Sequence, residues 1–123
     1  LLPSTDYLIV VVPLLPETRH LVDEDTFKAL PESAVLVNIS RGGVVDESAL
    51  IDALERGAIA GAGLDVFETE PLPETSPLWK FDDVILTPHV AGVSDQYMNR
   101  FSDVFIALYD SWLADEPLEN QIV

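Results

Sequence analysis

Cysteine is absent from this sequence of 123 residues, and lysine and arginine are scarce. Without cysteine the chain can form neither a disulfide nor a thiolate metal site, and we predict no metal site. The apolar runs are too short to cross a bilayer, and the first residues lack the basic segment of a signal peptide. We therefore expect a soluble, cytoplasmic protein without a membrane partner.

Acidic residues greatly outnumber basic ones, with 22 Asp and Glu against six Lys and Arg, which gives a formal net charge of −16. Such a surface repels nucleic acid, so no nucleic-acid partner is expected. The acidic residues are spread along the chain instead of forming a tail, which indicates a solvated surface. Adaptation to high salt is one explanation of this charge, and an ordinary acidic protein is the other.

Short apolar runs and helix caps alternate along the first three quarters of the chain. The runs predict strands at residues 7–12, 34–37, 59–67 and 84–86. Asp23 and Asp46 can cap helices that end near Pro31 and Gly57. Strands that alternate with helices pair in parallel, so we predict an α/β fold, half of a doubly wound (Rossmann) sheet of about four strands with flanking helices. The continuous apolar run at 7–12 predicts a strand covered on both faces.

The last quarter of the sequence predicts a long C-terminal helix that begins at Ser94 or Asp95 and is ended by Pro117. Its apolar residues recur at three- and four-residue steps and indicate a face for core or subunit packing: Met98, Phe101, Val104, Phe105, Leu108 and Trp112. We predict a boundary between a domain of residues 1–93 and a helix and tail at 94–123. The proline-rich segment 68–83 is expected to be irregular, with Trp79 and Phe81 packed against the body.

Arg41 follows a buried strand and precedes two glycines, which let the chain turn sharply toward the helix capped by Asp46. Open α/β sheets bind ligands at the carboxyl ends of their strands. A guanidinium fixed there suits a substrate carboxylate. The alternative is an arginine that caps carbonyl groups or pairs with a neighbouring acid.

Glu70 and His89 stand in the loops after the next two strands. The loops of a parallel sheet emerge at the same edge, so Arg41, Glu70 and His89 can reach one small molecule. A histidine with a carboxylate partner is a general acid and base, and the arginine supplies an anchor.

Four segments of the sequence resemble, in order and spacing, the signatures of the NAD(P)-dependent D-2-hydroxyacid dehydrogenases, which include phosphoglycerate and glyoxylate/hydroxypyruvate enzymes. They are residues 12–20 (VPLLPETRH), 38–46 (NISRGGVVD), 63–71 (GLDVFETEP) and 87–92 (TPHVAG). The resemblance covers nearly the whole chain.

The resemblance implies catalytic roles for three side chains. Arg41 would hold the substrate carboxylate and keto oxygen, and His89 would give a proton to the carbonyl as hydride arrives. Glu70, and not Glu68, would pair with His89. The implied partner is a small 2-keto or 2-hydroxy acid, and the implied assembly is a homodimer of the full-length protein.

The resemblance also implies an NAD or NADP site. Asp65 would accept a hydrogen bond from the nicotinamide carboxamide, Ile39 would lie where a backbone carbonyl meets that group, and the loop at 12–18 would lie beside the adenosine half. The residues so assigned are Val12, Pro13, Thr18, Ile39, Ser40, Arg41, Asp65, His89, Ala91 and Gly92.

The glycine-rich phosphate loop and the ribose-binding acid of a dinucleotide site are not found in the sequence. By the resemblance the chain is therefore expected to be a fragment, with weak NAD binding and no turnover alone. An NAD-sensing, corepressor-like binding protein with the same triad is the alternative function, and the acidic, lysine-poor composition favours the enzyme.

Overall fold

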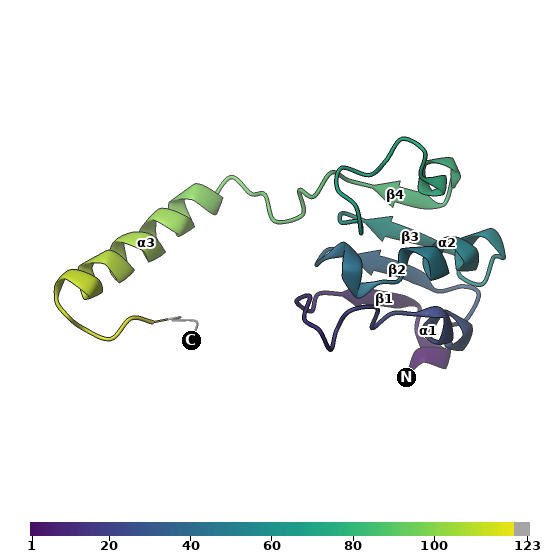
Figure 1. Ribbon diagram of the computed structural model, residues 1–123, viewed down its shortest axis with the longest axis horizontal. Coiled ribbons are helices and arrows are strands. Elements are labelled where there is room, and N and C mark those ends of the chain that lie inside the picture. Colours follow the sequence, from purple (N-terminus) through teal and green to yellow (C-terminus); the bar gives the residue numbers. More distant parts are fainter. Residues whose placement is uncertain (120–123) are drawn as a thin grey trace. The chain divides into compact units, whose positions relative to one another are not determined.

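The computed structural model describes residues 1–119, which form two compact units, one from Leu1 to Ala91 and one from Gly92 onward. The first unit holds a four-stranded parallel sheet in the order β1-β2-β3-β4, as Figure 1 shows. Its strands are β1 (Tyr7–Val10), β2 (Val35–Asn38), β3 (Gly61–Leu64) and β4 (Val84–Leu86). Consecutive parallel neighbours confirm the predicted half of a doubly wound sheet.

Helices α1 (Glu24–Ala29) and α2 (Glu47–Glu55) cover one face of this sheet (Figure 1). Both begin at the predicted caps: Asp23 accepts a hydrogen bond from the Thr26 N–H, and Asp46 accepts one from the Ala49 N–H. Gly57 follows α2 with a φ of 64°, a conformation that glycine adopts without steric cost. Local capping chemistry therefore determined both helices.

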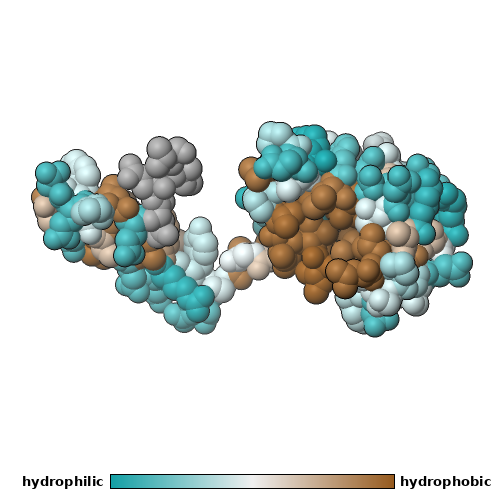
Figure 2. Space-filling view, turned by 90° about the horizontal axis from the view of Figure 1, so that it is seen from below, coloured by the Kyte–Doolittle hydropathy of each residue, from teal (hydrophilic) through white to brown (hydrophobic). Residues whose placement is uncertain are grey.

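The two faces of the sheet are buried very differently. Side chains toward the helices, among them Val10, Leu36 and Leu64, are almost fully buried and form the core with Phe27 and Leu50. The prediction of a strand covered on both faces is wrong in this chain, because alternate residues of the sheet point away from the helices and lie exposed. They include Tyr7, Ile9 and Ile85, and Val11, just beyond the end of β1, is exposed as well. Figure 2 shows hydrophobic residues gathered on one side of this unit.

Several element boundaries differ from the predicted ones. Strand β1 ends at Val10, two residues before the predicted end at residue 12, since the chain leaves the sheet ahead of Pro13. Strand β3 covers Gly61–Leu64 instead of the predicted 59–67, and it pairs with β2 on one side and β4 on the other. A Cβ on Gly61 would lie 2.3 Å from the Asp83 carbonyl oxygen, so this strand does admit another backbone closely, as its small residues predict.

Residues 68–83 are irregular except for a short 3₁₀ helix, η3 (Pro77–Lys80). Leu78 is the buried side chain of this helix, whereas Trp79 is 57% exposed. The prediction that Trp79 packs inward is wrong, and its indole N–H donates instead to the Pro73 carbonyl. Phe81 does pack against the core, as predicted.

The second unit contains one long helix, α3 (Tyr97–Leu113). It begins two residues after Asp95, because neither Ser94 nor Asp95 caps it and Gln96 takes the cap position without a side-chain bond. It ends four residues before Pro117, so proline is not its terminator. None of its residues is buried, and Phe101, Phe105, Tyr109 and Trp112 stack along its apolar side. Part of the predicted tail, residues 120–123, lies outside the described residues.

Within residues 1–119, no helix combines the length and the apolar character that a membrane span requires.

Candidate functional site

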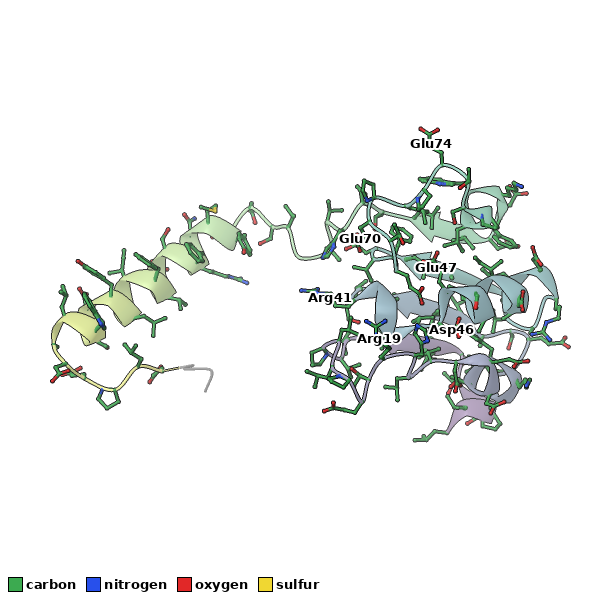
Figure 3. The ribbon with its side chains drawn as sticks, in the orientation of Figure 1. Arg19, Arg41, Asp46, Glu47, Glu70 and Glu74 are labelled. Carbon is green, nitrogen blue, oxygen red and sulfur yellow. The ribbon has the colours of Figure 1, made fainter. Side chains whose placement is uncertain are left out.

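The side chains of interest lie at the edge of the first unit where the parallel strands end. Arg41 follows β2, Glu70 follows β3, and His89 follows β4. Figure 3 shows Arg41 and Glu70 at this edge, with Asp46 and Glu47 at the start of α2 beside them. The topology therefore brings the three predicted loops to one side of the sheet, as expected for parallel strands.

His89 and Glu70 form a hydrogen-bonded pair. The Nδ1 atom of His89 lies 2.7 Å from Oε2 of Glu70, and the other oxygen, Oε1, accepts the Phe67 N–H at 3.0 Å. The hydrogen bond with His89 lowers the pKa of the Glu70 carboxyl; burial opposes this shift, and the hydrogen bond from the Phe67 N–H adds to it. Glu70 thus stays ionised and holds one nitrogen of the imidazole, which leaves Nε2 for other chemistry.

Asp65, at the end of β3, shapes the turn that carries His89. This carboxylate is 3% exposed and accepts hydrogen bonds from the Thr87 hydroxyl and from the N–H groups of Val90 and Ala91. Its own carbonyl accepts the His89 N–H at 2.8 Å, and His89 adopts a φ of 55°. Burial raises the pKa of the Asp65 carboxyl, but these hydrogen bonds outweigh burial and the pKa falls below its usual value.

Arg41 lies in the turn after β2, and buried Asn38 shapes that turn. The Asn38 amide donates to the Arg41 carbonyl, and its oxygen accepts from the Ser40 N–H and hydroxyl. One guanidinium nitrogen of Arg41 donates to the Ser40 carbonyl at 2.6 Å, in line with the carbonyl-capping alternative. Over residues 1–119 no carboxylate lies within ion-pair distance of Arg41, so most of its donors are available to an anion.

Gly42 brings the Arg41 turn into direct contact with the loop that carries Glu70. A Cβ at this position would lie 1.9 Å from the carbonyl carbon and oxygen of Phe67 and 2.4 Å from the Glu68 nitrogen. Real Cβ atoms do not approach so closely, so only glycine fits between the two loops. The spacing between Arg41 and Glu70 depends on this contact.

The residues predicted to hold a cofactor do not all lie in one place. Val12, Pro13, Ser40 and Arg41 line one open cleft of about 590 Å³ between the loops after β1 and β2. The Thr18 hydroxyl stabilises the first of these loops, since it donates to the Pro13 carbonyl and accepts the Leu15 N–H. Ile39 is exposed beside Ser40.

The other predicted cofactor residues lie around His89 or beyond it. Asp65 and Ala91 belong to the turn of His89, whereas exposed Gly92 is the first residue of the second unit. The cleft between the first two loops has the open shape and mixed polar and apolar lining that part of a dinucleotide needs. These residues therefore fit the group, and their roles toward it remain predictions.

A larger apolar cleft of about 680 Å³ opens beside the His89–Glu70 pair. The residues that line it with the pair are Phe67, Pro71, Leu72, Trp79, Leu86, Thr87 and Pro88. Exposed Trp79, which was predicted to pack against the body, is thus part of a wall of this cleft. An apolar cleft with a hydrogen-bonded histidine–carboxylate pair at its rim favours a small molecule that has one reactive polar end.

A second histidine with carboxylate neighbours lies at the same edge and was not predicted. Nε2 of His20 lies 2.9 Å from Oε1 of Glu68, and Nδ1 lies 3.9 Å from Oδ2 of Asp46. Glu68 also exchanges hydrogen bonds with Glu47, because the backbone N–H of each residue meets a carboxylate oxygen of the other. His20 lies in the loop after β1, as Arg41 lies in the loop after β2. This position in a loop after a strand is the sequence signal that could have identified His20 as a site residue.

Comparison with known proteins identifies a family model and several relatives that match this sequence. The profile of the D-isomer specific 2-hydroxyacid dehydrogenase NAD binding domain matches residues 1–91. A glyoxylate reductase of Korarchaeum cryptofilum is 46% identical over 104 residues, which are 85% of this chain and 31% of that protein. A glyoxylate reductase of Pyrococcus horikoshii is 50% identical over 94 residues, 76% of this chain and 28% of that protein. The chain thus spans about a third of the length of these curated relatives.

Solved structures agree. The D-isomer specific 2-hydroxyacid dehydrogenase of Xanthobacter autotrophicus Py2, in complex with NADPH and MES, aligns with a TM-score of 0.90 and 43% identity. The alignment covers 99% of this chain and 50% of that one. The NADPH-dependent glyoxylate/hydroxypyruvate reductase of Sinorhizobium meliloti, with NADP and sulfate, gives 0.89 and 33% over 98% of this chain and 39% of that one. The chain therefore belongs to the D-isomer specific 2-hydroxyacid dehydrogenase family.

Proposed function

We propose that this chain is the catalytic-residue-bearing part of a longer enzyme that reduces small 2-keto acids to D-2-hydroxy acids with NADH or NADPH. The single observation that carries the proposal is the His89–Glu70 hydrogen bond beside an arginine free of carboxylate partners among residues 1–119. Membership of the family supports the same reaction.

The proposed chemistry assigns one task to each side chain. Arg41 binds the substrate carboxylate and orients the keto group, because its planar fork matches a carboxylate. His89 donates the proton on Nε2 to the carbonyl oxygen as negative charge develops there, and neutral His89 takes it back in the oxidative direction. Glu70 holds the opposite nitrogen, Nδ1, and so orients the ring. A bound nicotinamide would supply the hydride.

We propose that the cofactor lies along the open cleft between the loops after β1 and β2. Val12 and Pro13 would form one wall and Ser40 and Arg41 the other, Ile39 would lie beside Ser40, and Thr18 would keep the first loop in shape. Asp65, Ala91 and Gly92 would border the nicotinamide end. The Asp65 carboxylate accepts three hydrogen bonds already and has capacity for about one more, which a carboxamide could use.

Glyoxylate and hydroxypyruvate are the substrates we propose to test first, because the similar proteins bear those names. We also propose a cytoplasmic homodimer, which the family resemblance implies. The formal charge of −16 suits an enzyme that tolerates high salt, where screening reduces self-repulsion.

The test is NAD(P)H oxidation by the longer polypeptide with a panel of 2-keto acids at low and high salt. We expect turnover that Arg41→Gln lowers mainly through a higher KM. The matched control, Arg56→Gln, replaces an arginine whose side chain donates to the Asp52 carbonyl of its own helix, and it should leave the rate unchanged. Cofactor binding without turnover on any keto acid would overturn the proposal in favour of an NAD-sensing binding protein.

A further inference from the structure

His20 and His89 are the two histidines of the chain, and both contact the same loop. Glu68 and Glu70, two residues apart on the loop after β3, face one histidine each. Glu70 belongs to the proposed catalytic pair. Glu68 and His20 have no part in the proposed chemistry, so their contact needs another explanation.

His20 is tied to the loop after β2 through its backbone. Its N–H donates to the Gly43 carbonyl at 2.9 Å. Two residues later, the Val22 N–H donates to the Val44 carbonyl and the Val22 carbonyl accepts the Asp46 N–H. His20 holds a φ of 53°, which is uncommon for residues other than glycine. The imidazole is thereby aimed at the start of α2 and at the loop after β3.

Acidic side chains face both nitrogens of this ring. Glu68 lies at Nε2 and Asp46 at Nδ1, while Glu47 holds Glu68 through two hydrogen bonds. The basic residue nearby is Arg19, whose Nη1 lies 3.3 Å from where a Cβ of Gly43 would be. Nε2 is buried but is not aligned for a hydrogen bond with Glu68, so the contact is electrostatic and strongest with a charged imidazole.

We propose that His20 is a positioning residue that joins the three loops after β1, β2 and β3 and so fixes Glu70 for its bond with His89. Gly42 keeps the second and third loops in contact, and His20 with Glu68 holds them there. The proposal concerns the geometry of the pair, so it stands or falls apart from the reaction in which we propose that the pair acts.

The test is imidazole NMR of the ¹⁵N-histidine-labelled chain. The proton on Nδ1 of His89 should be shifted downfield and protected from exchange with water by its bond to Glu70. In His20→Asn the backbone conformation is retained, because Asn tolerates positive φ, but the side chain no longer reaches Glu68. We expect that proton to exchange up to about fivefold faster, as for the loss of one partly exposed ion pair that holds the Glu70 loop.

Three further variants separate positioning from general stability. Glu68→Gln should act like His20→Asn, since it removes the charge that faces the ring. His20→Gln keeps a donor that can reach Glu68 but carries no charge, so it should restore only part of the protection. Phe27→Leu loosens the core on α1 but removes no side-chain contact of His20 or Glu68, so it should leave the His89 proton unchanged at temperatures where the chain is folded.

An unchanged His89 proton in both His20→Asn and Glu68→Gln would overturn the proposal, and so would equal loss in Phe27→Leu. Loss of protection in the two loop variants alone supports it. The exchange of the His89 proton is measured without substrate. If the longer enzyme were inactive while the two loop variants still lost protection, the proposed reaction would be refuted and the role of His20 would stand.

Discussion

The two histidine–glutamate pairs at the edge of the sheet make an instructive contrast. Both imidazoles are partly exposed, both residues have a positive φ, and both carboxylates come from one loop. In the His89 pair one nitrogen is hydrogen-bonded and the other meets no acid among residues 1–119. In the His20 pair both nitrogens face carboxylates. A free second nitrogen, more than the carboxylate, therefore distinguishes the proposed proton donor from the proposed positioning residue.

The largest effect is expected from His89→Gln in the longer enzyme. The amide cannot transfer a proton at neutral pH, so kcat should fall by about 10²–10⁴-fold. A steady-state assay with glyoxylate measures this. The contrast between the pairs fails if His20→Gln lowers kcat as much as His89→Gln does.

Gly42→Ala should disturb both pairs together. The new methyl group would overlap the Phe67 backbone, and relief of that overlap must push the loops apart at a cost of about 2–3 kcal/mol. Denaturant unfolding measures the cost. Gly63→Ala is the matched control, because a Cβ there would meet only Val37, at 3.9 Å. Equal stability of the two variants would show that the loops are not in close contact.

Asp65→Asn should affect the His89 turn and spare the His20 contact. The amide has one oxygen in place of two and cannot accept from the Thr87 hydroxyl, Val90 and Ala91 in the same way. We expect a loss of about 1–2 kcal/mol in the free energy of unfolding. Amide exchange should rise at Val90 and Ala91, and exchange at Val22 should stay as it was; uniform acceleration would contradict the assignment.

The smallest effect is on the pH dependence of stability. The pKa of Glu70 and that of Asp65 are both lowered in the folded chain. Their stabilisation is therefore complete above the ordinary carboxyl range and is lost as the pH falls through the folded values, below about pH 4. Thermal unfolding across this range should show a shallower acid limb for Asp65→Asn. A parallel limb would remove Asp65 from the explanation.

The sequence predicted what local chemistry or parallel topology determines. The caps at Asp23 and Asp46 are local, and the placing of Arg41, Glu70 and His89 at one edge follows from strand order. The pairing of Glu70 with His89, and not Glu68, came from family resemblance. Nothing in the spacing of Glu68 and Glu70 distinguishes them.

Other features depend on tertiary contacts that no local pattern encodes. His20 meets Glu68 only because two loops converge, and Gly42 is required only because the Phe67 backbone passes beside it. Trp79 was predicted to pack against the body, yet it forms part of the wall of a cleft. Asp95 has good cap chemistry, but α3 starts without it.

Strand β1 finally bears on how the chain behaves in solution. Among residues 1–119 it pairs with β2 alone, so its other side offers unused amide and carbonyl groups next to outward-facing Tyr7 and Ile9. Such an edge is a template on which a strand of a second molecule can add. Mutual repulsion of molecules that each carry a formal charge of −16 opposes this addition, so concentrated salt will favour aggregation of the isolated chain.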